Sequence, residues 1–162
     1  IGGIYVNINY FYKNATICLN GHIVSKDEAN YSKFCKVCGE TNISKCQHCT
    51  TPIQGVIYIP DGFPITNYNR PNYCHACGKP YPWTEKIINN AVELVSLDDQ
   101  LSDDYKEIIK NALPDLITDT LNTPIAQVKY KKYMSSASKY IQDSARNLLI
   151  DVVSDAVKKS IF

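Results

Sequence analysis

The chain has 162 residues, 17 Lys and Arg against 16 Asp and Glu, and a formal net charge of +1. This size fits one ordinary domain or two small ones, and the balanced charge gives no overall signature of nucleic-acid binding. No run approaches the roughly 18 apolar residues of a membrane-spanning helix. The seven cysteines, one of them necessarily unpaired, and the absence of a signal-peptide pattern at the visible N-terminus predict a reducing, cytoplasmic location.

The first part of the chain predicts short strands. Residues 5–12 alternate and are rich in Ile, Val, Tyr and Phe, which predicts an N-terminal strand or hairpin. A second strand is expected over residues 53–59, ended by the turn sequence at 60–62. We interpret the polar stretch 63–70 as a solvated linker.

Around these strands lie four short pairs of metal-binding residue types. One is a Cys-x3-His pair and three are Cys-x2-Cys pairs: Cys18 with His22, Cys35 with Cys38, Cys46 with Cys49, and Cys74 with Cys77. Two residues between thiolates is the span of a tight turn that directs both sulfurs at one ion. Eight such ligands are enough for two closed tetrahedral sites, and we expect two structural Zn²⁺ ions.

The pairs can be combined in more than one way. The preferred combination is sequential, with each half of the region forming one zinc ribbon. Site 1 then consists of Cys18, His22, Cys35 and Cys38, and site 2 of Cys46, Cys49, Cys74 and Cys77. A RING-like cross-braced arrangement, which joins the first pair to the third and the second to the fourth, stays open.

Other uses of these cysteines are weaker hypotheses. The odd number of cysteines does not suit a set of disulfides. A thioredoxin-like redox site would need a helix after a cysteine pair, and no helical pattern follows any of the first three pairs. Rubredoxin-like iron would suit only site 2, which has four cysteines. A catalytic zinc has about three protein ligands and an open position, so we expect no enzyme. The remaining catalytic alternative is that His48 or His75 displaces a cysteine.

The composition changes near Trp83. We expect a double zinc-ribbon region over 1–83 and a helical region over 84–162, and therefore an α+β fold. Helices are predicted at about 84–96, 102–113 and 124–160. Thr84, Ser102 and Thr123 are the expected N-caps, and Pro114 should end or kink the second helix.

The third helix has a wide apolar stripe with spacings of three and four residues. The stripe runs through Tyr130, Met134, Ala137, Ile141, Ala145, Leu148, Val152 and Ala156. Such a stripe must be covered, either by the shorter helices or by a second copy of the chain.

Charge is unevenly distributed in the helical region. Residues 86–120 have a net charge of −5, and residues 121–162 a net charge of +4. The simplest interpretation is that these two segments form ion pairs with each other. The alternatives are that the basic helix binds nucleic acid or an anionic membrane surface.

Several motifs carry a family resemblance. They are Cys18-Leu19-Asn20-Gly21-His22, Phe34-Cys35-x2-Cys38-Gly39, Cys46-x2-Cys49-x-Thr51-Pro52-Ile53-x-Gly55, and Tyr73-Cys74-His75-x-Cys77-Gly78-Lys79-Pro80-Tyr81-Pro82-Trp83-Thr84-Glu85. With these motifs the chain resembles a bacterial tandem zinc-ribbon family of unknown function. The resemblance implies two zinc sites on a small soluble protein and no activity to transfer.

These observations favour a non-catalytic zinc-binding adaptor that acts through a protein partner or through self-association. Residues 80–83 are one candidate contact surface, but the preferred interpretation is that the Trp83 cluster docks the helices onto the second ribbon. One alternative is a nucleic-acid-binding accessory factor that uses the ribbons and the basic helix. Another is a membrane-active or defence-type effector acting through the amphipathic C-terminal helix; no transmembrane span is expected, and peripheral membrane contact is the least favoured.

Overall fold

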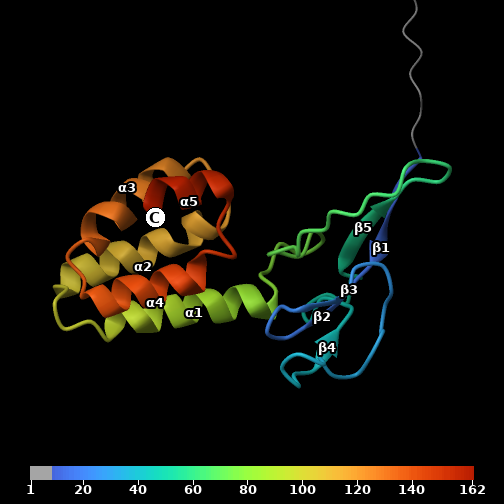
Figure 1. Cartoon of the computed structure of the whole chain (residues 1–162), viewed down its shortest axis with the longest axis horizontal. Helices are drawn as coiled ribbons and strands as arrows, with labels where there is room; N and C mark the ends of the chain where they lie inside the picture. Colours follow the sequence, from blue (N-terminus) through green and yellow to red (C-terminus); the bar gives the residue numbers. More distant parts are fainter. Residues whose placement is uncertain (1–8) are drawn as a thin grey trace, which may run out of the picture. The chain divides into compact units, whose positions relative to one another are not determined.

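The structure is a computed structural model that describes residues 9–162. The chain divides into two compact units, Ile1–Thr84 and Glu85–Phe162. Short antiparallel strands lie in the first unit and helices dominate the second (Figure 1). The predicted α+β fold is confirmed. The first four residues of the predicted N-terminal strand, 5–8, lie outside the described part of the chain.

Two small sheets organise the first unit. Strand β1 (Phe11–Asn14) pairs with β5 (Gln54–Tyr58), which confirms the predicted strand over 53–59. In the other sheet, β2 (Thr16–Cys18) lies between β3 (Ile23–Ser25) and β4 (Asn42–Ile43). Because β2 ends at Cys18, this central strand delivers the first potential metal ligand directly.

The segment 63–70 is mostly exposed, as we expected for a solvated linker, but hydrogen bonds also attach it to the first unit. The Lys26 ammonium donates to the carbonyl of Thr66 at 3.1 Å, and the Tyr68 hydroxyl donates to the carbonyl of Gln54 at 2.6 Å. Burial raises the pKa of Tyr68 to about 12. The Thr66 carbonyl and the Tyr68 hydroxyl thus have partners elsewhere in the unit.

The aromatic side chains at the end of the first unit form part of its core. Tyr81 and Trp83 are each 1% exposed, and their rings stack with centroids 4.8 Å apart. They pack with Ile17 and Ile53, and the Trp83 indole N–H donates to the carbonyl of Pro71 at 2.9 Å. The hypothesis that residues 80–83 present a contact surface is therefore wrong, since its large side chains are inside.

Helix α1 (Pro82–Ser96) begins earlier than predicted. Proline suits the first turn of a helix because its missing N–H would have no partner there. Thr84 is not the N-cap: it lies inside the helix, where its hydroxyl donates to the carbonyl of Asn72 at 2.8 Å.

Helix α2 (Asp103–Ile117) confirms Ser102 as its N-cap, since the Ser102 hydroxyl accepts from the amide of Tyr105 at 3.3 Å. The predicted end at residue 113 is wrong, because the helix continues through Pro114. A proline this close to the end removes one backbone hydrogen bond. The continuing turn buries Leu116 and Ile117, which offsets that loss.

The single helix predicted over 124–160 is also wrong. Three helices occupy this segment: α3 (Thr123–Met134), α4 (Lys139–Leu149) and α5 (Asp155–Ile161). Ser138 and Ser154 start α4 and α5 by accepting hydrogen bonds from backbone amides three residues later. Neither break needs glycine or proline, because a serine cap supplies the partner that the helix start lacks. The expected cap of α3 is one residue off: the N-cap position is Asn122, and Thr123 is the first helical residue.

The breaks let the apolar stripe fold onto itself and onto the other helices. The buried members of this core include Ile109, Leu113, Leu116, Tyr130, Met134, Ile141, Leu149, Val153 and Val157. The stripe is therefore covered within the unit, except at Ala156, which is exposed, and it does not require a second copy of the chain. Across residues 9–162, no helix combines the length and hydrophobicity needed to cross a bilayer.

The acidic and basic segments of the helical unit do not pair as expected. The ion pairs found among the described residues join Lys110 to Glu107, Lys139 to Asp143 and Lys158 to Asp155. Each is a local contact within one helix. The lysines of α3 consequently have no acidic partner in this part of the chain.

Candidate metal centres

A recurring backbone turn presents the paired cysteines. At Cys35 the amide of Gly39 donates to the Cys35 carbonyl at 2.8 Å, and the Cys35 amide donates to the carbonyl of Glu40 at 2.8 Å. Gly39 has φ +73°, a left-handed conformation that glycine adopts without steric cost. The turn brings Cys35 and Cys38 to the same side of the chain.

The other two Cys-x2-Cys turns repeat this geometry. The residue after the second cysteine again has positive φ, at +72° for Gly78 and +62° for Thr50. Its amide donates to the carbonyl of the first cysteine, at 2.8 Å for Cys74 and 3.0 Å for Cys46. Thr50 therefore occupies a glycine position, which is a strained conformation for a β-branched residue.

The Cys-x3-His pair is built around Gly21. Gly21 has φ +87°, and its amide donates to the carbonyl of Cys18 at 2.8 Å. The guanidinium of Arg70 donates to the Gly21 carbonyl and lies 5.8 Å from the Trp83 ring. Arg70 thus links the turn between Cys18 and His22 to the core of the first unit.

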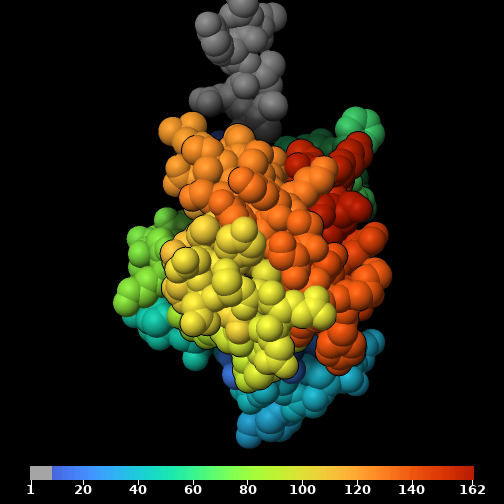
Figure 2. All heavy atoms as spheres, turned by 90° about the vertical axis from the view of Figure 1, so that its left-hand side faces the viewer, coloured from blue at the N-terminus to red at the C-terminus, as the bar shows by residue number. Residues whose placement is uncertain are grey.

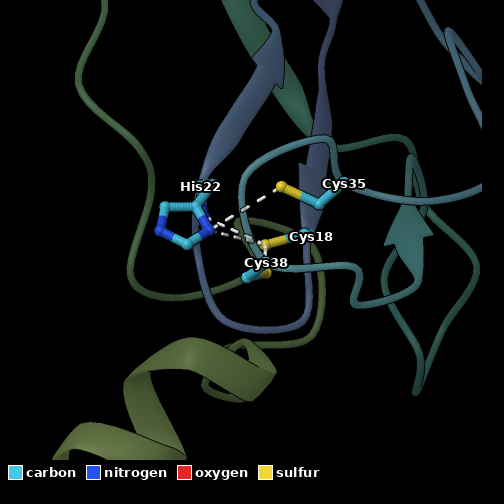
Figure 3. A group of neighbouring side chains, drawn as sticks. All are labelled: Cys18, His22, Cys35 and Cys38. Carbon is cyan, nitrogen blue, oxygen red and sulfur yellow. Dashed lines mark hydrogen bonds between the residues drawn. The ribbon is translucent and has the colours of Figure 1, made fainter.

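The first ligand group unites Cys18, His22, Cys35 and Cys38, whose ligand atoms all lie within 4.8 Å of one another. Figure 3 shows the His22 ring turned toward the sulfurs, with Nδ1 at 3.4 Å from Cys18 Sγ and 3.7 Å from Cys35 Sγ. Cys18 Sγ and Cys38 Sγ are 3.8 Å apart. The imidazole nitrogen available to an ion is therefore Nδ1.

The second ligand group unites Cys46, Cys49, Cys74 and Cys77 within the same 4.8 Å limit. Cys46 Sγ lies 3.7 Å from Cys77 Sγ, and Cys49 Sγ lies 3.6 Å from Cys74 Sγ. Cys46 and Cys74 also belong to the buried core of the unit. The ligand set and the core thus share side chains, so filling the site and packing the unit are coupled.

Both groups fit a tetrahedral ion. Metal–sulfur bonds of about 2.3 Å at tetrahedral angles place sulfurs about 3.8 Å apart, close to the separations observed here. Each group supplies four donors, which completes the tetrahedron. These donor sets are the ones that Zn²⁺ prefers in structural sites, and thiolate-rich sets also suit iron.

Backbone and side-chain donors favour the thiolate form that binds metal. The Glu40 amide holds the pKa of Cys38 at about 6, with a further contribution from the Asn20 amide. Burial opposes ionisation of Cys74, but the amides of Cys77 and Ala76 outweigh it and lower the pKa of Cys74 to about 6. Each group therefore contains a thiol that readily becomes a thiolate.

Other thiols respond differently to their surroundings. Burial raises the pKa of Cys18, whereas the Thr51 hydroxyl and amide lower that of Cys49. The Lys79 amide favours the Cys77 thiolate, but desolvation and the neighbouring thiols raise its pKa to about 11. A cation bound between the sulfurs would favour the thiolate form of each of these groups.

The grouping answers two questions that the spacing left open. The structure places together the sequential pairs, and it does not place together the pairs that a cross-braced arrangement would join. His48 and His75 are exposed and belong to neither group. Sequence reasoning did not find the roles of Arg70 and Thr50. Thr50 had a signal, since it stands where the other two Cys-x2-Cys turns have glycine.

The fold and these groups define a class: an α+β protein whose strand-rich unit has two four-residue groups able to hold metal ions. Residues 11–161 match the family described as "Uncharacterized protein conserved in bacteria (DUF2321)", and the chain belongs to that family. No curated protein and no solved structure shows a significant match to this chain.

Proposed function

We propose that this protein is a non-catalytic zinc-binding adaptor of the bacterial cytoplasm. Two structural Zn²⁺ ions fold its first unit, and the protein acts by binding another protein. The observation that supports the metal part is the closed donor set, with four converging ligands in each group at the separations of a tetrahedral ion. Free cysteines used as ligands fit a reducing compartment.

The absence of a catalytic role is part of the proposal. Zinc catalysis needs a coordination position for water or substrate, and three Cys and one His, or four Cys, fill all four. The exposed His48 and His75 lie outside both groups, so neither opens a site by replacing a cysteine. The role of the metal ions is then to stabilise the folded chain, and each site contributes about 10 kcal/mol of metal-binding free energy to folding.

Metal content per chain, measured by native mass spectrometry before and after chelation, tests the metal part. We expect two zincs in the wild type, and one each in Cys38→Ser and Cys77→Ser. His48→Ala and His75→Ala are matched controls, each expected to keep two zincs. A single zinc in the wild type, or bound iron, would contradict the two closed zinc sites.

Affinity capture and light scattering test the adaptor part. We expect the metal-loaded protein to retain a defined partner that the Cys38→Ser, Cys77→Ser double variant does not retain, or to associate with itself. A protein that remains monomeric and shows no specific partner would contradict the adaptor function while leaving the zinc sites intact.

Nucleic-acid binding is a second candidate, favoured by an exposed aromatic face on β1 and β5. Phe11 and Tyr58 are opposite each other in the strand register, 49% and 45% exposed, with ring centroids 5.1 Å apart. The Lys13 ammonium lies 4.5 Å from the Tyr58 ring. Such a face can stack bases beside a cation. Single-strand binding that falls steeply with salt and is lost in Phe11→Ala would support it; no binding at low salt would contradict it.

The membrane-active alternative loses its main support. It relied on one long amphipathic helix, and this segment instead forms three helices, each of which packs an apolar face into the core of the second unit.

A further inference from the structure

Helix α3 has apolar residues on two faces. Its inner face packs Ala126, Tyr130 and Met134 into the core of the second unit. Its outer face exposes Ile125 at 59% and Val128 at 66%. A helix that only covers a core normally has a polar outer face, so the second apolar face needs a separate explanation.

The exposed residues form a line along the helix, which we call the outer stripe: Leu121, Ile125 and Val128. Leu121, two residues before α3 begins, is 99% exposed. A spacing of three residues places Ile125 and Val128 on one side of the helix, and Leu121 lies in the turn that leads into it, so the outer stripe spans about 10 Å. This length matches two turns of an opposing helix. In Figure 2 the orange segment that includes α3 lies at the surface of the molecule.

Lysines surround the outer stripe. By helical spacing, Lys129 and Lys131 lie on opposite sides of it, and Lys132 continues its line. Helix α3 contains no acidic residue, and none of these lysines forms an ion pair within residues 9–162. The helix dipole accounts for Lys131 and Lys132 in the last turn. It accounts neither for Lys129 nor for the apolar residues between the charges.

We propose that the outer stripe is the docking site for a short amphipathic helix of another protein, with apolar residues at spacings of three and four and Asp or Glu on both flanks. Apolar anchors would pack on Ile125 and Val128, and the acidic flanks would pair with the lysines. This inference rests on the proposed adaptor function and names its partner class.

Charge disfavours a second copy as the occupant, and the small size of the apolar face disfavours a membrane. A two-fold contact between the outer stripes of two copies would bring six lysines together, which is repulsive. An anionic membrane would meet the same lysines. However, interfacial helices bury a broad apolar face, whereas α3 offers Ile125 and Val128, and its other face is already packed.

Fluorescence anisotropy with two labelled peptides tests the proposal on the full-length, metal-loaded protein. The acidic peptide is a designed helix of about four turns with Leu at helical spacing and Glu on both flanks, and the second peptide has Lys in place of each Glu. We expect the acidic peptide to bind at least about tenfold more tightly than the basic one, with affinity falling as salt rises.

Variants locate the binding site. The double variant Ile125→Ser, Val128→Ser should weaken the acidic peptide by at least about tenfold, and Lys129→Gln, Lys132→Gln should reduce the salt dependence. Tyr140→Ser, which alters a residue on α4 that is 78% exposed, is the matched control and should leave affinity unchanged. Thermal unfolding of each variant shows whether the fold is retained.

The outcomes are decisive in both directions. Equal binding of the two peptides, unchanged binding by the stripe variant, or no binding at all would overturn the proposal. So would dimerisation that the stripe variant abolishes, or binding to phosphatidylglycerol vesicles in preference to the acidic peptide. Metal content of the same samples separates the two proposals: two zincs without peptide binding refutes only the docking site, whereas peptide binding without zinc refutes only the metal part of the proposed function.

Discussion

Asp98 and Ser138, which are 40 positions apart, are joined by two hydrogen bonds: the Ser138 amide and hydroxyl both donate to Asp98 Oδ2, at 2.8 and 2.7 Å. The other oxygen, Oδ1, accepts from the amides of Gln100 and Leu101 at 2.7 and 2.8 Å. One buried carboxylate thus shapes the α1–α2 turn and holds the start of α4. It fixes the break between α3 and α4 that lets the apolar stripe fold into the core.

Replacing this carboxylate should destabilise the helical unit. In Asp98→Asn an amide group would face N–H donors and leave buried partners unsatisfied, and we expect a loss of about 2–3 kcal/mol in the free energy of unfolding at pH 7. Urea unfolding followed by circular dichroism measures it. Asp99→Asn, at an exposed neighbour, should change stability by less than about 0.5 kcal/mol. Equal effects would contradict the role of Asp98.

The same carboxylate predicts a pH dependence. Burial alone would raise the pKa of Asp98, but the hydrogen bonds from Ser138, Leu101 and Gln100 outweigh it and the pKa is lowered. Its stabilisation is therefore fully present above an unfolded-state pKa of about 3.9 and is lost as pH falls through the lower folded-state pKa. Wild type and Asp98→Asn should converge in stability over that acidic window. A difference in stability between the two proteins that stays constant as pH falls through the folded-state pKa of Asp98 would contradict this assignment.

Glycine at position 21 should be less replaceable than glycine at position 39. A Cβ at Gly21 would collide with the Arg70 guanidinium and lie 2.9 Å from Trp83 Cβ, whereas a Cβ at Gly39 meets nothing within 4 Å. Both have positive φ. We expect Gly39→Ala to cost about 1 kcal/mol and Gly21→Ala about 3 kcal/mol. Chemical unfolding of the metal-loaded variants tests the ranking, which a smaller effect at Gly21 would reverse.

Thr50 offers a stabilising substitution. Its φ of +62° is strained for a β-branched residue, so Thr50→Gly should gain about 1 kcal/mol despite the added freedom of the unfolded chain. Gly78→Thr places threonine at the equivalent position of another turn and should lose a similar amount. Melting temperatures of the two metal-loaded variants should move in opposite directions. A shift in the same direction would show that φ does not control this position.

Chelation should affect the two units differently. Cys46 and Cys74 are core residues of the first unit, so removing the metal should unfold that unit. Helices α2 to α5 bury their own apolar residues and should retain most of the helical circular dichroism signal. Amide hydrogen exchange with and without chelator can assign the loss to each unit. Complete loss of helix on chelation would show that the helical unit depends on the metal.

The sequence by itself determined the features that depend on local spacing. Neighbouring residues decide short-range backbone geometry, and several features could therefore be predicted. They are the turns of the Cys-x2-Cys pairs with Gly39 and Gly78, the strand over 53–59, and the Ser102 cap. The α+β composition follows from the same signals, because glycine and proline are concentrated before residue 85.

Only the tertiary structure decided the features that depend on contacts distant in sequence. These features are the choice of which ligand pairs converge, the hydrogen bond from Arg70 to Gly21, and the burial of Trp83. Each requires contact between segments tens of residues apart. Residues 125–160 contain no glycine or proline, so their sequence favours one helix. Burial of both parts of the apolar stripe, with Asp98 bonded to Ser138, favours three helices instead. Packing free energy exceeds the small helix propensity differences at these serines, and the fold follows the packing.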